Sequence, residues 1–230
     1  MKIDIIVTDY DRTIADENNN FMIDRKLKEF LIKLPKKKIL ATGRRLNDIP
    51  DKDVLKIFDV LVLENGTILF SKNKKEILPG NNWFVMREKI INLLNENKID
   101  FVLGDVIVYS ELKNYHYIER VIKENNFLNY VNIEFNKDSF MIMPYGWNKG
   151  KGVKIAIERI GNGKIVAIGD EINDISLFEI ADFKIAVNNA ILELKRKADI
   201  VCNKNNGEGV LEVLMSIWKE EFLEYQDSIK

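Results

Sequence analysis

Two aspartates, Asp9 and Asp11, stand one residue apart at the point where the apolar run Ile5-Ile6-Val7 ends. The run predicts a buried parallel strand, whose carboxyl end opens into the crevice where open α/β sheets bind ligands. Side chains alternate along a strand, so both carboxylates share one face. Close carboxylates repel, which favours a bound cation or one raised pKa, and hence a nucleophile beside an acid/base. The alternative is a solvated turn, because Asp is a common turn residue.

Further polar side chains fall where other strands end or helices begin: Thr42 with Gly43, Lys149, and Asp170 with Asp174. Carboxylates from two strand ends can hold one hard cation such as Mg²⁺. The threonine offers a hydroxyl beside a glycine that lets backbone approach an anion, and the lysine offers a positive charge. Together these groups describe a phosphate site. Taken singly, each could instead be a helix cap or a turn.

The elements that must position these groups alternate between strand and helix, which indicates a parallel α/β sheet. Asp24 can cap a helix that Pro35 ends, and Asn65-Gly66 is a hairpin turn signal. A final amphipathic helix is expected at 209–225. The expected strands are 5–7, 38–41, 60–63, 67–70, 164–168, 183–187 and 200–202, and the expected helices are 24–34, a short one within 46–58, 149–160, 175–181 and 190–198.

The pattern changes between Pro79 and Pro144, where the expected order is helix, two strands, helix, two strands. This αββαββ order predicts a small antiparallel sheet with helices on one face, as an α+β module inserted in the chain. The sequence therefore predicts a discontinuous core domain of residues 1–78 and 146–230 and an inserted domain of residues 79–145. Tyr109, Glu111 and Met143 lie near its strand ends, where packing or solvent contact is the favoured interpretation.

Composition excludes several classes of function. The 230 residues are 46% hydrophobic and 31% charged, and 35 basic residues nearly balance 36 acidic ones, which gives no reason to expect nucleic acid or an anionic membrane as partner. The basic runs at 36–38 and 72–75 are expected to be solvated loops. A lone Cys202 in an apolar segment suggests a core residue in a reducing compartment, and the lack of a signal or spanning segment predicts a cytoplasmic location. The single His116 is expected to be structural.

These motifs, taken in order, resemble those of the haloacid dehalogenase superfamily phosphatases of the Cof-like, type IIB branch. The first motif, DxDxT, is matched by Asp9, Asp11 and Thr13, the second by Thr42, the third by Lys149, and the fourth, GDxxND, by Gly169 to Asp174. Two phrases typical of the branch also occur, Glu64-Asn65-Gly66 and Asn189-Ala190. The resemblance covers the two core segments, about two thirds of the chain. It implies a Rossmann-like core carrying a cap of the C2 type.

The resemblance also implies a mechanism through an aspartyl phosphate. Asp9 would attack phosphorus, and Asp11 would protonate the leaving alcohol and then activate water. Thr42 and Lys149 would bind the phosphoryl oxygens, and Asn173 would contact the phosphate or Lys149. The family's Mg²⁺ would sit on Asp9, the backbone carbonyl of Asp11, Asp170 and, directly or through water, Asp174. Gly43 and Arg44 are further candidates for substrate contact, with a salt bridge as the alternative for Arg44.

One position departs from the family. Arg12 stands where glycine is common between the second aspartate and the threonine, so it could crowd the loop or reach toward an acidic substrate. The size of the inserted module resembles the caps of archaeal-type phosphoglycolate phosphatases. The expected partner is therefore a small phosphorylated metabolite, with 2-phosphoglycolate first and a hexose, sucrose, trehalose or mannosylglycerate phosphate second. A phosphomutase of the phosphomannomutase type and a noncatalytic phospho-ligand binder are the alternatives, and the sequence leaves a homodimer open.

Overall fold

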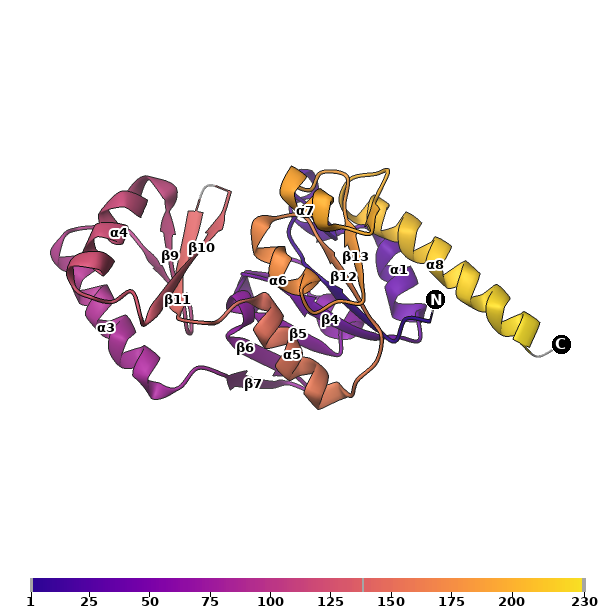
Figure 1. The fold of residues 1–230 in the computed structure, drawn as a ribbon, viewed down its shortest axis with the longest axis horizontal. Helices are drawn as coiled ribbons and strands as arrows, with labels where there is room; N and C mark the ends of the chain where they lie inside the picture. Colours follow the sequence, from indigo (N-terminus) through magenta and orange to yellow (C-terminus); the bar gives the residue numbers. More distant parts are fainter. Residues whose placement is uncertain (1, 138, 229–230) are drawn as a thin grey trace.

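The computed structural model describes residues 2–137 and 139–228, which form two lobes (Figure 1). The small lobe contains the elements from α3 (Asn81–Glu96) to β11 (Ser139–Pro144), and the large lobe contains everything before and after it in the chain. The two lobes lie side by side along the longest axis of the molecule. The expected α/β core with an inserted α+β unit is confirmed.

One mixed sheet organises the large lobe, in the order β14-β13-β12-β1-β4-β5-β6-β7. The neighbours from β14 to β5 pair in parallel, whereas β6 and β7 pair antiparallel at one edge. The strands are β1 (Ile5–Thr8), β4 (Lys37–Ala41), β5 (Val60–Leu63), β6 (Ile68–Ser71), β7 (Lys74–Ile77), β12 (Ile165–Gly169), β13 (Phe183–Ala186) and β14 (Ile200–Val201). The central strand β1 is wholly buried, as its continuous apolar run predicts.

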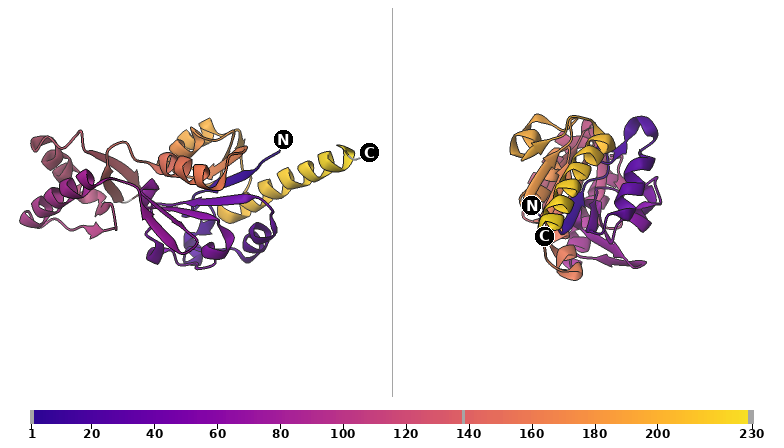
Figure 2. Two further views of the ribbon diagram at one scale, coloured as in Figure 1. Left: turned by 90° about the horizontal axis from the view of Figure 1, so that it is seen from below. Right: turned by 90° about the vertical axis from the view of Figure 1, so that its right-hand side faces the viewer.

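Helices cover both faces of this sheet (Figure 2), as right-handed crossovers between parallel strands require. The helix α1 (Arg25–Lys33) begins where the Asp24 side chain accepts backbone N–H groups, which is the predicted cap, and it packs with α8 (Asn206–Ser228). On the other face, α5 (Lys149–Ile160) packs against α6 (Ile175–Phe178). Two shorter helices are α2 (Val54–Ile57) and α7 (Leu192–Lys197), and a small hairpin pairs β2 (Ala15–Asp16) with β3 (Met22–Ile23).

The small lobe has the predicted αββαββ order. After α3 come β8 (Val102–Leu103), β9 (Val108–Glu111), α4 (Tyr115–Glu124), β10 (Val131–Asn136) and β11. Its antiparallel sheet has the order β10-β11-β9-β8, and α3 and α4 lie on the side away from the large lobe (Figure 1). The other side of this sheet therefore faces the carboxyl ends of the parallel strands. Such a lobe can cover a site at that edge.

Two basic runs differ from the expectation of solvated loops. Lys74 and Lys75 begin β7, an edge strand whose residues are all exposed, so a highly charged segment pairs with β6. Lys38 lies buried within β4, where its Nζ donates to the carbonyl oxygens of Leu34 and Lys36 at 2.9 and 2.7 Å. Backbone carbonyls replace water around that ammonium group, which a reading of charge alone could not show. Cys202 is buried, as predicted.

Candidate active site

The polar groups singled out in the sequence gather at the edge of the large sheet that faces the small lobe. Asp9 directly follows β1, and Thr42 and Asp170 directly follow the neighbouring strands β4 and β12. Lys149 is the first residue of α5, which packs against β4 and β5. The carboxyl ends of parallel strands meet at one edge, so residues far apart in the chain come together there.

Lys149 joins two carboxylates in a buried network. Its Nζ lies 2.6 Å from Asp9 Oδ1 and 2.7 Å from Asp174 Oδ1, and it also donates to Asn173 Oδ1 at 3.3 Å. The side chains of Lys149, Asp9 and Asp174 are 2%, 6% and 0% exposed, so water screens these charges little. The expected contact between Lys149 and Asn173 is present.

Burial sets the protonation of these groups. The pKa of Asp9 is raised well above its ordinary value, first by burial, which outweighs the opposing charge of Lys149. Burial alone would lower the pKa of Lys149, but the carboxylates of Asp174 and Asp9 more than compensate and raise it. The two carboxylates therefore favour the charged form of Lys149. Burial and the Asp174 charge raise the pKa of Asp170 to about 7, against the opposing effects of Arg12 and Thr13.

Asp9, Asp170 and Asp174 each offer a carboxylate oxygen within 4.8 Å of the others. Hard oxygen donors at this spacing suit a hard cation such as Mg²⁺. Asp170 is held by the Thr13 hydroxyl at 2.9 Å, and Asp174 Oδ2 accepts the backbone N–H groups of Asp170 and Glu171 at 3.0 and 3.1 Å. The donor set is therefore built in advance and fits the ion that the sequence predicts.

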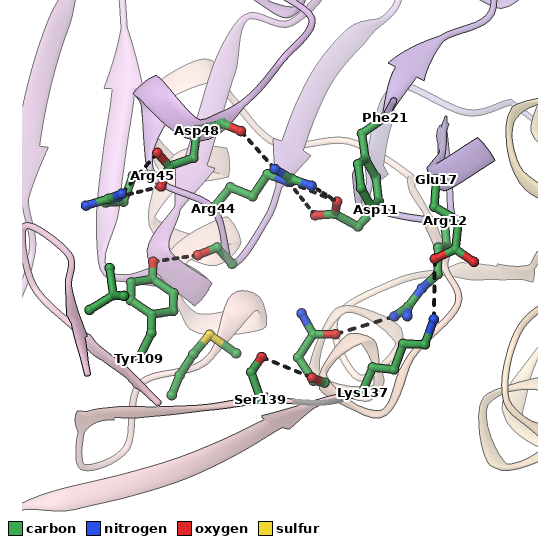
Figure 3. A pocket seen from close by; sticks show the side chains of 14 residues that line it. Asp11, Arg12, Glu17, Phe21, Arg44, Arg45, Asp48, Tyr109, Lys137 and Ser139 are labelled. Carbon is green, nitrogen blue, oxygen red and sulfur yellow. Dashed lines mark hydrogen bonds and ion pairs between the residues drawn. The ribbon is translucent and has the colours of Figure 1, made fainter. Parts of the chain in front are cut away.

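Asp11 has a different partner. Arg44 Nη2 lies 2.6 Å from Asp11 Oδ1, and Arg44 Nε lies 2.9 and 3.0 Å from the two carboxylate oxygens. The guanidinium also stacks on the Phe21 ring, 4.6 Å from its centroid (Figure 3). The carboxylate of Asp11 thus stands apart from the three-carboxylate group, and the ligand expected from this residue is its backbone carbonyl. The salt bridge expected as one alternative for Arg44 is present.

The loop after β4 offers polar groups for an anion. Thr42 is fully buried, and its Oγ1 accepts the backbone N–H of Arg44 at 3.1 Å, which leaves the hydroxyl proton to donate elsewhere. The backbone carbonyl of Gly43 accepts the hydroxyl of Tyr109 from β9 at 2.8 Å. This bond ties the loop of the large lobe to the sheet of the small lobe.

A cavity of about 520 Å³ lies between the lobes, next to this loop (Figure 3). The large lobe contributes Asp11, Arg12, Arg44 and Arg45, among others, to its wall. The small lobe contributes Val102, Tyr109, Asn136, Lys137, Ser139 and Met141. Sequence reasoning missed most of these small-lobe residues and favoured packing for Tyr109. The alternation along β10 and β11 was the available signal, but it does not say which face meets the large lobe.

Arg12 reaches both the acidic group and the small lobe. Its Nε lies 3.2 Å from Asp170 Oδ2, and its Nη2 lies 3.4 Å from both Glu171 Oε2 and Asn136 Oδ1. Its φ of 55° is in the left-handed region that favours glycine, the residue common at this position in the family it resembles. Arg12 therefore has a strained backbone conformation, and its side chain contacts both lobes.

Comparison with known proteins agrees with this geometry. Residues 84–214 match the family model described as haloacid dehalogenase-like hydrolase. Phosphoglycolate phosphatase 2 of Saccharolobus solfataricus is 37% identical over 224 residues, which cover 95% of this chain and 94% of that protein. Phosphoglycolate phosphatase of Sulfurisphaera tokodaii is 36% identical, with 93% of each chain covered. A solved structure from Thermoplasma acidophilum superimposes with a TM-score of 0.77 at 18% identity, covering 94% of this chain and 98% of that one.

The chain thus belongs to the haloacid dehalogenase-like hydrolase family. It is a phosphatase of that family. The part of the chain that the structure describes holds no helix long and apolar enough to span a membrane.

Proposed function

We propose that the chain is a Mg²⁺-dependent phosphomonoesterase that hydrolyses 2-phosphoglycolate through an aspartyl-phosphate intermediate. The observation that carries the mechanism is the buried network of Asp9, Lys149 and Asp174. Support for the substrate comes from the 37% identity to a phosphoglycolate phosphatase along nearly the whole chain. In this proposal residues 1–78 and 146–230 form the catalytic core, and residues 79–145 form the cap.

Asp9 is the proposed nucleophile. One of its carboxylate oxygens forms the bond to phosphorus while the bond from phosphorus to the leaving oxygen breaks. Lys149, 2.6 Å from Asp9 Oδ1, opposes the rise that burial causes in the pKa of Asp9, and it offsets the repulsion between this carboxylate and an anionic substrate. In this proposal Thr42 and Lys149 bind the phosphoryl oxygens, and Asn173 contacts the phosphate or Lys149.

Asp11 is the proposed acid/base. It would give a proton to the leaving alcohol oxygen and then take one from the water that cleaves the aspartyl phosphate. Its carboxylate lines the cavity, about one fifth exposed, so a leaving group and water can reach it. The bond to Arg44 fixes its orientation before substrate arrives.

Asp9, Asp170, Asp174 and the backbone carbonyl of Asp11 are the groups proposed to hold Mg²⁺. When bound, the ion would neutralise phosphoryl charge as a Lewis acid. The Thr13 hydroxyl keeps Asp170 oriented toward this position through the hydrogen bond described above.

The substrate proposal agrees with the charges around the cavity. A phosphorylated carboxylic acid such as 2-phosphoglycolate carries negative charge at both ends. The guanidinium groups of Arg12 and Arg44 and the ammonium group of Lys137 line the cavity, together with the carboxylates of Asp11 and Glu17 that pair with Arg44 and Lys137. A carboxylate there gains charge-assisted hydrogen bonds that a neutral sugar hydroxyl cannot match.

The test is Mg²⁺-dependent phosphate release from 2-phosphoglycolate, glucose 6-phosphate, sucrose and trehalose phosphates and p-nitrophenyl phosphate. We expect 2-phosphoglycolate to have the highest kcat/KM and EDTA to abolish release. The Asp9→Asn variant should lose activity by roughly 10³-fold or more, because it lacks the nucleophile but keeps the volume. Activity retained in that variant would refute the mechanism.

The panel separates the alternatives. A sugar phosphate with the highest kcat/KM would replace 2-phosphoglycolate as the substrate. Transfer of phosphate within a sugar without net release would indicate a mutase. Tight phosphate binding without turnover of any ester would indicate a binder. Asp100→Asn, at an exposed position between α3 and β8, is the matched control and should behave as wild type.

A further inference from the structure

A glutamate that the proposed mechanism does not use links the two lobes. Glu64 follows β5 and belongs to a 3₁₀ turn, Glu64–Gly66 (η3), in the large lobe. Its side chain is fully buried, yet no lysine or arginine lies within ion-pair distance of it among the described residues. A buried carboxylate needs compensation for the water it has lost.

The compensation comes from the backbone of the small lobe. Glu64 Oε1 accepts the N–H of Asp105 at 2.7 Å, and Oε2 accepts the N–H groups of Val106 and Ile107 at 2.9 and 3.0 Å. These three residues lie in the turn between β8 and β9. Consecutive backbone N–H groups that converge on one anion form a nest, and each such bond to a charged acceptor is stronger than a neutral one.

The turn is shaped to accept this carboxylate. A Cβ placed on Gly104 would lie 2.3 Å from Glu64 Oε2, so a larger residue would displace it. Arg45 Nη1 donates to the Leu103 carbonyl at 2.8 Å, and Arg87 Nη2 donates to the Gly104 carbonyl at 2.6 Å. The backbone N–H groups of the turn therefore fix the position of the carboxylate, and the two arginines hold the turn itself in place.

The other side of η3 contacts the loop after β4, residues 42–45, which is the proposed phosphate-binding loop. The backbone N–H of Asn65 donates to the Thr42 carbonyl at 3.0 Å, and that of Glu64 donates to the Arg44 carbonyl at 3.1 Å. Glu64 and Asn65 both have positive φ values, 45° and 55°, a strained conformation for residues other than glycine. Contacts on both sides hold this strained conformation: the Glu64 side chain bonds to the small lobe, and the backbone of η3 bonds to the loop after β4.

We propose that Glu64 is a positioning residue that anchors the β8–β9 turn of the small lobe to the phosphate-binding loop. The anchor places the β9 and β11 side chains that form the far wall of the cavity, including Tyr109 and Met141. The anchor therefore affects how the leaving group of the substrate binds, and it does not affect how the phosphoryl group binds. This inference rests on the proposed function for its kinetic consequence, whereas its structural consequence is independent of any activity.

The structural test is amide hydrogen exchange in wild type and in Glu64→Gln, followed by mass spectrometry. The glutamine has the same shape but only one acceptor oxygen, and its NH₂ group faces backbone donors. We expect the amides of 105–107 to exchange about tenfold faster or more, while those of β1 and β12 are unchanged. Gly104→Ala disturbs the same contact from the small lobe and should give the same pattern. Glu76→Gln, on the exposed strand β7, is the matched control.

The kinetic test compares substrates with different leaving groups. In both variants we expect KM for 2-phosphoglycolate to rise about fivefold or more, while kcat stays within about twofold of wild type. The hydrolysis of acetyl phosphate should also stay within about twofold of wild type, because its leaving group is small and needs little protonation. A variant that fails to fold is replaced by the other for both tests.

Unchanged exchange at 105–107 in both variants would overturn the proposal. So would faster exchange with an unchanged KM, because the contact would then be structural only. A wild-type enzyme that hydrolyses none of the panel esters would refute the proposed function, while the exchange comparison would still decide whether Glu64 anchors the turn.

Discussion

Asp9 and Asp11 are separated by one residue but lie in different electrostatic surroundings. Asp9 is almost fully buried and bonded to the buried Lys149, whereas Asp11 is one fifth exposed and bonded to Arg44 at the cavity wall. A buried pair cannot lose one partner without leaving an uncompensated charge, but water can replace a partner of the partly exposed pair. The Asp9–Lys149 pair therefore supports both the fold and the chemistry, whereas the Asp11–Arg44 pair can exchange its contacts during turnover.

The largest expected effect comes from Lys149→Met. Removing the ammonium group leaves Asp9 and Asp174 as close, unpaired buried carboxylates, so the free energy of unfolding should fall by about 3–5 kcal/mol. Urea denaturation followed by circular dichroism measures this change, and phosphatase activity should fall to background. Lys154→Met, an exposed position on the same helix, is the control. A loss below about 1 kcal/mol would contradict the difference drawn between the two pairs.

Arg44→Met should have a smaller effect on the fold. The partly exposed pair with Asp11 predicts a loss of only about 1 kcal/mol, because water can solvate the freed carboxylate. We expect kcat for alkyl phosphates to fall roughly tenfold, since the acid/base loses its orientation, and acetyl phosphate hydrolysis to fall less. Steady-state kinetics on both substrates checks this, with Arg25→Met on the surface of α1 as control. Equal losses on both substrates would mean that Arg44 acts on the phosphoryl group.

Arg12→Gly should have the smallest effect. Glycine relieves the positive φ but gives up the contacts with Asp170 and Glu171, so the free energy of unfolding should stay within about 1 kcal/mol of wild type. Without a guanidinium beside Asp170, the Mg²⁺ concentration for half-maximal activity should fall a few-fold, because one competing cation is gone. A Mg²⁺ titration measures it, and Arg12→Ala removes the same charge while keeping the strain. A higher Mg²⁺ requirement in both variants would show that Arg12 helps to hold the ion.

The placement of the large-lobe site could be predicted from sequence because it depends on local patterns. An apolar run followed by Asp9, and a similar run followed by Asp170, place both residues at the carboxyl edge of a parallel sheet. Asp24 could be assigned as a helix cap for the same reason, since a cap bonds with residues two and three positions away.

Contacts that depend on the docking of distant segments could not be predicted. Glu64-Asn65-Gly66 was recognised as a phrase typical of the branch, but the partners of Glu64 lie 41 to 43 residues away. The orientation of Arg44 toward Asp11 likewise depends on how the loops after β4 and β1 meet. Strand β7 was missed because charged residues are depleted in strands, and pairing with β6 overrides that preference here.

The same strand β7 has a consequence for the behaviour of the chain at high concentration. It is the last strand of the large sheet, so among the described residues one row of its backbone N–H and C=O groups has no neighbouring strand. Such an edge can recruit a strand from another copy and start aggregation. The exposed Lys74, Lys75 and Glu76 place charges along this edge, and Lys75 and Glu76 form ion pairs with Asp105 and Arg159. Strand β7, which has the composition of a solvated loop, thereby disfavours the pairing of this sheet edge with a strand of another copy.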